Sequence, residues 1–161
     1  MLKQRKSPRL TDYDYNSNGV YFLTFCTTNK EKIFGEIVGG DALGAPQMRL
    51  SAEGKIVEEH IRSTDRLPYA TLLHYVVMPN HVHLLVLIDT TNNSVNDNPQ
   101  TAAVPSVISA VKRFTNQQIG RNIFQRSYHD HVVRNEADFQ RIWEYIDTNP
   151  IKWTMDKFYV D

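Results

Sequence analysis

Two apolar runs joined by only two residues constrain the fold of this chain more than any other feature. The runs are TLLHYVVM (71–78) and HVHLLVLI (81–88), and Pro79-Asn80 separates them. A short Pro-Asn connection between β-forming runs predicts a β-hairpin. Because nearly every position is apolar, we expect both strands in the centre of a sheet, with at least one face covered by helices.

One more strand and a helix precede this hairpin in the sequence. The run GVYFLTFCTT (19–28) is rich in aromatic and β-branched residues, which predicts a buried strand. The segment GGDALGAP (39–46) is rich in glycine and predicts a loop. After Ser51, apolar residues recur at helical spacing, so we expect a helix over about 52–64 with Ser51 as its N-cap.

The second half of the chain predicts two helices with a short extended run between them. The first helix is expected to begin at Pro105 and to end at Gly120. Its apolar stripe consists of Val107, Ile108, Val111 and Phe114. Residues 123–133 predict the extended run. The last helix covers 136–150 and is stopped by Pro150, which disfavours the α conformation at Asn149.

These elements predict an α+β fold, an antiparallel sheet with helices packed on it. The length of 161 residues fits one domain over 1–161, with a basic arm at 1–10 and a polar, mobile loop at 89–104. No apolar run reaches the roughly 18 residues that span a bilayer, and the charged N-terminus lacks the apolar stretch of a secretory signal. A single cysteine, Cys26, favours a reducing, cytoplasmic location.

The net charge is zero, which by itself argues against a strongly basic nucleic-acid-binding protein. The basic residues are nevertheless concentrated in the arm and in residues 105–135, where a local groove for phosphate is conceivable. The candidate DNA-binding residues are Arg5, Lys6, Arg9, Lys112, Arg113, Arg126 and Arg134. The alternative is that these segments are ordinary solvated surfaces.

His81 and His83 are the most distinctive polar residues of the chain, because they interrupt an apolar strand. Side chains at positions i and i+2 of a strand point to the same face, so the two imidazoles project side by side. Neutral imidazole is a common ligand of divalent metals. The pattern favours a ligand pair over two histidines that are satisfied within the core.

Tyr145 and Asn149 lie four residues apart on the last predicted helix and therefore on one of its faces. A tyrosine hydroxyl is a weak nucleophile at neutral pH because its pKa is near 10. Attack on a phosphodiester becomes feasible when a metal neutralises the phosphate oxygens. The tyrosine then forms a covalent link to the phosphate, which suits strand transfer better than hydrolysis.

Three segments together resemble the single-tyrosine transposases that carry an HUH motif. They are VVMPNHVH (76–83), QRSYHDHVVRN (125–135) and YIDTNPIKW (145–153). The resemblance extends from about Arg5 to Trp153 and is strongest to the REP-associated tyrosine transposases, which process short hairpin repeats. It implies the ferredoxin-like fold of HUH nucleases.

The resemblance also implies a set of roles. His81, His83 and Asn149 would bind Mg²⁺ or Mn²⁺, and Tyr145 would attack single-stranded DNA that carries a hairpin. The products would be a 5′-phosphotyrosine and a free 3′-OH. The expected location is the cytoplasm, in association with the nucleoid. A homodimer and a monomer are both compatible with the family.

Three alternatives stay open at this point. The chain could be an inactive regulator that only binds hairpin DNA. It could be a metallohydrolase that uses water, although no carboxylate adjoins the histidine pair in the sequence. A second pair, His129 and His131, repeats the spacing beside Tyr128 and could form another metal site or contact phosphate.

Overall fold

The structure, a computed structural model, describes residues 19–40, 44–89 and 99–161. The strands are β1 (Gly19–Cys26), β2 (Gly35–Val38), β3 (Gln47–Leu50), β4 (Ala70–Val77), β5 (His81–Ile88) and β6 (His129–Val132). The helices are α1 (Ala52–Arg62), α2 (Pro99–Ile119) and α3 (Glu136–Thr148), with short 3-10 turns η1 (Thr28–Lys30), η2 (Ser63–Arg66) and η3 (Trp153–Met155). The predicted basic arm lies outside the described residues.

Four strands form one antiparallel sheet in the order β4-β5-β1-β6. β4 and β5 are the hairpin that the sequence predicts, and β5 is central. β4 lies at an edge, so the expectation of two central strands is wrong for β4. Its side chains are covered from both faces instead: the Tyr75 hydroxyl donates to Glu58 of α1, and His74 stacks on Trp143 of α3.

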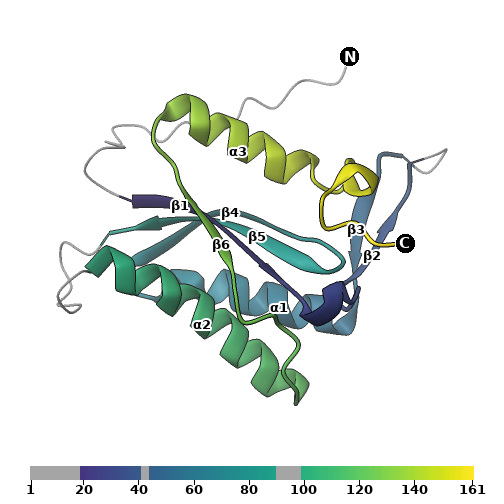
Figure 1. The fold of residues 1–161 in the computed structure, drawn as a ribbon, viewed down its shortest axis with the longest axis horizontal. Coiled ribbons are helices and arrows are strands. Elements are labelled where there is room, and N and C mark those ends of the chain that lie inside the picture. The colour runs from purple at the N-terminus through teal and green to yellow at the C-terminus, as the bar shows by residue number, and fades with distance from the viewer. Residues whose placement is uncertain (1–18, 41–43, 90–98) are drawn as a thin grey trace.

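Helices pack on both faces of this sheet, with α1 and α2 on one side and α3 on the other (Figure 1). On the first side, apolar residues of both helices and of β5 share one cluster, which includes Val57, Ile61, Val107, Val82 and Leu84. On the second side, α3 forms a cluster with the central strands, which includes Phe139, Ile142, Ile146, Val20 and Leu85. This arrangement confirms the predicted α+β class.

The first helix begins where the sequence predicts. The Ser51 hydroxyl accepts a hydrogen bond from the Gly54 amide at 3.0 Å, which satisfies one of the free amides of the first turn. α1 ends at Arg62, and the predicted remainder continues as the 3-10 turn η2.

The helix α2 is longer than predicted. It begins at Pro99 and contains Pro105, so residues 99–104 are helical and do not belong to the predicted loop. Pro105 is the seventh residue of α2, so its missing amide costs one hydrogen bond inside the helix. The expectation fails because a proline disfavours an interior helical position but does not exclude it. Residues 90–98 of that loop lie outside the described residues. Gly120 ends the helix at a φ of +91°, as expected.

One member of the predicted stripe on α2 is wrong. Val107, Ile108 and Val111 are buried, but Phe114 is 44% exposed. Its ring stacks on His60 of α1 with the ring centroids 5.9 Å apart.

The two-stranded hairpin β2–β3 was not predicted, because its strands have only four residues each. Gly35 is essential to its geometry. The residue has a φ of +139°, and a Cβ atom there would lie 2.1 Å from the Arg49 carbonyl oxygen. Among the described residues, no helix has both the length and the apolar character needed to cross a membrane.

Candidate active site

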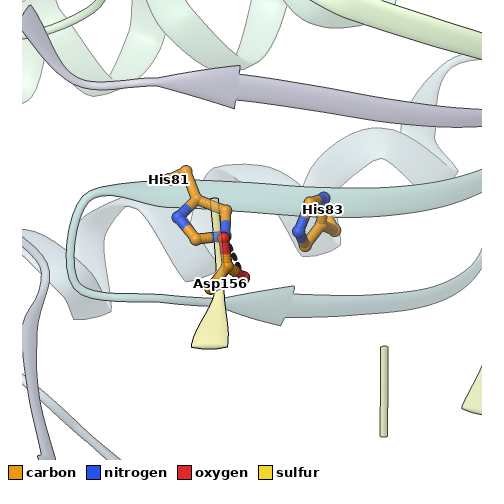
Figure 2. A group of neighbouring side chains, drawn as sticks. All are labelled: His81, His83 and Asp156. Atoms are coloured by element: carbon orange, nitrogen blue, oxygen red, sulfur yellow. Dashed lines mark ion pairs between the residues drawn. The ribbon is translucent and has the colours of Figure 1, made fainter. Parts of the chain in front are cut away.

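His81 and His83 lie side by side on β5 and face the α3 side of the sheet, opposite to Val82 and Leu84. Their ring centroids are 4.7 Å apart, and 0% and 1% of the two residues is exposed. Figure 2 shows both imidazoles projecting from the same strand. The predicted geometry of the pair is therefore confirmed.

The Nδ1 atom of each imidazole is held by a neighbouring side chain. Nδ1 of His81 lies 2.8 Å from the amide oxygen of Asn80, and because that oxygen only accepts, the proton resides on Nδ1. Nδ1 of His83 lies 2.6 Å from the hydroxyl of Thr24, its register partner on β1. These contacts orient the rings and leave Nε2 of His81 as a lone-pair donor toward the site.

The helix α3 brings Tyr145 and Asn149 to the same place. Asn135 caps its start by accepting from the Asp138 amide at 2.8 Å. The helix ends at Thr148, but Asn149 keeps α conformation at φ −56° and ψ −46°, so the expected exclusion by Pro150 is wrong. The proline effect is a bias, and here the turn continues with the Lys152 amide donating to the Thr148 carbonyl at 3.1 Å.

Tyr145 lies between the buried histidine pair and solvent. Its ring centroid is 5.3 Å from that of His83 and 6.0 Å from that of Phe22, and the residue is 38% exposed. Burial raises the pKa of its hydroxyl, as does the negative charge of Asp156, whereas the side chain of Asn149 lowers it. The nucleophile candidate is thus reachable from solvent and adjacent to the other site residues.

Asp156 is a site residue that sequence reasoning missed. It follows η3 in the C-terminal segment, and its side chain is 3% exposed. Oδ1 accepts from the Phe158 amide at 2.8 Å, and Oδ2 lies 3.8 Å from Nε2 of His81 (Figure 2). No spacing or motif in the sequence distinguishes this carboxylate from the other acidic residues.

These residues fit a divalent cation. One ligand atom each of His81, His83 and Asp156 lies within 4.8 Å of the others. In the part of the chain that the structure describes, Nε2 of both histidines and Oδ1 of Asn149 are buried without a hydrogen-bond partner. Buried polar atoms without partners are costly, and a bound cation would satisfy all three.

Both histidines are in the protonation state that metal binding requires. Burial lowers the pKa of His81 to about 3, and burial lowers the pKa of His83 well below its ordinary value, with His81 and Lys157 contributing further. Neutral imidazoles at this position are available as ligands throughout the physiological pH range.

Comparison with known families decides what kind of protein carries this site. The sequence model of a family described as "Transposase IS200 like" matches residues 16–149. The chain belongs to the IS200-like transposase family. This membership confirms the resemblance found in the sequence, supports a role as a DNA-processing enzyme, and suggests dependence on a metal.

A curated relative and two solved structures are similar to this IS200-like transposase. An uncharacterized protein of Haemophilus influenzae is 32% identical over 179 residues, covering 99% of this chain and 96% of the relative. The structure of a REP-associated tyrosine transposase bound to a REP hairpin matches with a TM-score of 0.59 at 19% identity, covering 91% of this chain and 73% of that one. A candidate transposase from Deinococcus radiodurans matches with a TM-score of 0.50 at 18% identity, covering 89% and 97%.

The basic residues singled out for DNA binding lie in different surroundings in this IS200-like transposase. Arg113, Arg126 and Arg134 are exposed. Lys112 is half-buried, and its ammonium donates to the carbonyl oxygens of Gln125 and Ser127 at 2.8 and 3.3 Å. Arg5, Lys6 and Arg9 lie outside the described residues.

The second histidine pair does not form a second cluster of metal ligands among the described residues. His129 and His131 are exposed on the edge strand β6, opposite Thr24 and Phe22 of β1. Nε2 of His131 lies 2.7 Å from Oδ2 of Asp138, so this imidazole connects β6 to the first turn of α3.

Proposed function

We propose that this transposase cleaves and rejoins single-stranded DNA next to a hairpin, with Tyr145 as the nucleophile. One observation carries the proposal. The ring centroid of Tyr145, on α3, lies 5.3 Å from that of His83, beside buried polar atoms of the site that have no hydrogen-bond partner.

The reaction is a transesterification. The Tyr145 oxygen bonds to the phosphorus of one phosphodiester, and the bond from that phosphorus to the 3′ oxygen breaks. The phenolic proton ends on the released 3′ oxygen. The products are a 5′-phosphotyrosine and a free 3′-OH, and attack by another 3′-OH reverses the step and joins a different strand.

The protein residues supply the positioning. His81, His83 and Asn149 would hold Mg²⁺ or Mn²⁺, and the carboxylate of Asp156 is placed to complete the set. When bound, such a cation offsets charge on the non-bridging phosphate oxygens. Burial and the negative charge of Asp156 raise the pKa of Tyr145, so the site without a cation disfavours the phenolate. A positive charge near the Tyr145 oxygen would instead lower this pKa.

The proposed substrate class is supported by the structural relative, which is bound to a REP hairpin. We therefore infer a hairpin-bearing single strand as the partner of this chain, and the nucleoid as its location. The exposed Arg113, Arg126 and Arg134 are the described candidates for contacts with the DNA backbone. The state of assembly, homodimer or monomer, stays a prediction.

A second candidate is hydrolysis of a phosphodiester by water. The sequence places no carboxylate beside the histidine pair, but the structure places Asp156 there, 3.8 Å from His81. A carboxylate near a metal could accept a proton from water. The third candidate, an inactive hairpin-binding regulator, shares the fold but needs none of these contacts.

A denaturing gel separates the three candidates. Labelled single-stranded hairpins with varied flanks are mixed with the protein and Mn²⁺ or a chelator, and an adduct that survives SDS is sought. We expect a metal-dependent adduct that Tyr145→Phe abolishes and Tyr128→Phe preserves. Cleavage without an adduct indicates the hydrolase, and hairpin binding without cleavage indicates the regulator. An adduct that survives Tyr145→Phe overturns the assignment of the nucleophile.

A further inference from the structure

A cavity of about 790 Å³ lies between the β2–β3 hairpin and the C-terminal segment, next to the metal-ligand cluster. Figure 1 shows the C-terminal segment beside these two strands. We propose that this cavity binds an unpaired base of the DNA strand whose phosphate occupies the active site. The inference rests on the proposed function and identifies a part of the substrate that the site would recognise.

The cavity and the active site share a wall. Trp153 lines the cavity, is 8% exposed, and its ring centroid lies 6.0 Å from that of His81. Two prolines of the lining, Pro79 and Pro150, directly adjoin Asn80 and Asn149. The cavity therefore adjoins the active site through Trp153.

The lining presents the surfaces that a nucleobase needs. Tyr159 lies against Trp153 with the ring centroids 5.2 Å apart, and both residues, with Ile37 and Ile151, provide apolar area. A base can stack on such side chains with either flat face, whichever of the four bases it is. The volume falls in the range of sites for small organic ligands.

Charge at the rim favours a phosphate on the same strand. Lys32 and Arg49 line the cavity together with Glu36, which forms an ion pair with Arg49 across the hairpin. The lining charge is therefore positive by one, and Lys32 is available for a phosphate. An occupant with a flat apolar body and a negatively charged phosphate would contact both the aromatic lining and Lys32.

Intrinsic fluorescence tests base binding without relying on cleavage. The chain has two tryptophans, so Trp143→Phe leaves Trp153 as the only reporter. The protein is the full chain carrying both Trp143→Phe and Tyr145→Phe, in the presence of a chelator. We would titrate it with tetranucleotides of dA, dC, dG or dT and with an abasic tetramer. We expect at least one base-containing tetramer to quench Trp153 with a Kd at least tenfold below that of the abasic strand.

Two further variants locate the effect. Tyr159→Ala and, separately, Ile151→Ser should weaken base-dependent binding at least tenfold, because both residues are exposed lining residues. Phe114→Ala, an exposed aromatic on the far helix, should not change it. Equal affinity for abasic and base-containing strands, no quenching at all, or quenching unaffected by both lining variants overturns the proposal.

The outcome is separable from that of the proposed function. Base-dependent quenching can persist when no adduct with Tyr145 forms, which would refute the chemistry and leave the cavity assignment standing. An adduct without any base-dependent quenching would refute the cavity assignment alone.

Discussion

Nε2 of His74 on the edge strand β4 lies 2.7 Å from Oδ1 of Asp147 on α3. Asp147 stands two residues after Tyr145 and two before Asn149, and the His74 ring also stacks on Trp143 at 4.1 Å. At the other end of α3, His131 of the opposite edge strand binds Asp138. The helix that carries the nucleophile is thus held at both ends, each to a different edge of the sheet.

We predict that His74→Ala lowers the rate of adduct formation about tenfold while the chain stays folded. Loss of one hydrogen bond and one stacking contact costs about 1–2 kcal/mol of stability, and a small displacement of Tyr145 is amplified in the rate. His60→Ala is the matched control, since His60 also stacks on an aromatic ring and binds a side chain, Gln118, but joins α1 to α2. Equal rates in both variants would contradict the positioning role.

Acid should destabilise the fold through the buried histidines. Burial lowers the pKa of His81 to about 3 in the folded chain, against about 6.5 when unfolded. Between these values the unfolded chain binds more protons, so the free energy of unfolding falls as pH drops below 6.5 and is unaffected above it. The slope is about 1.4 kcal/mol per pH unit for one such histidine.

Urea unfolding in chelator at pH 7, 6 and 5 measures this slope. His81→Gln should reduce it by about 1.4 kcal/mol per pH unit. A slope that His81→Gln does not alter would show that the buried imidazole is not responsible.

Removing the charge of Asp156 should weaken metal binding. Asp156→Asn keeps an oxygen that can accept from the Phe158 amide but loses the carboxylate that faces His81. We expect Mn²⁺ affinity, measured by calorimetry, to fall about tenfold or more. Asp138→Asn, a carboxylate at the far end of α3, is the control and should bind Mn²⁺ as the unaltered chain does.

Lys112 should act on stability more than on DNA. Its ammonium binds two carbonyl oxygens and lies 5.6 Å from the ring centroid of Phe25, and burial lowers its pKa. Lys112→Met leaves those carbonyls without a donor and should lower the free energy of unfolding by about 1–2 kcal/mol. Arg113→Met, on the exposed side of α2, should leave stability unchanged and weaken DNA binding. If Lys112→Met instead weakened DNA binding and left stability unchanged, Lys112 would be a DNA contact.

Short-range patterns were enough to predict much of this protein. The period of two in a strand put His81 and His83 on one face, and the period of a helix put Tyr145 and Asn149 on another. Both predictions depend on geometry within one element, so no knowledge of packing was needed. The family motifs then joined the two pairs, and the structure agrees with that pairing.

Packing between distant segments decided the rest. Whether β4 is central or at an edge depends on which strand pairs with β1, and residues 70–77 alone do not contain that information. Asp156 reaches His81 only because the C-terminal segment folds back over β5, and the cavity beside Trp153 exists only where that segment meets the β2–β3 hairpin. Local sequence sets the direction of each side chain, whereas contacts across 75 residues, as between His81 and Asp156, arise only when buried surfaces of several elements are satisfied together.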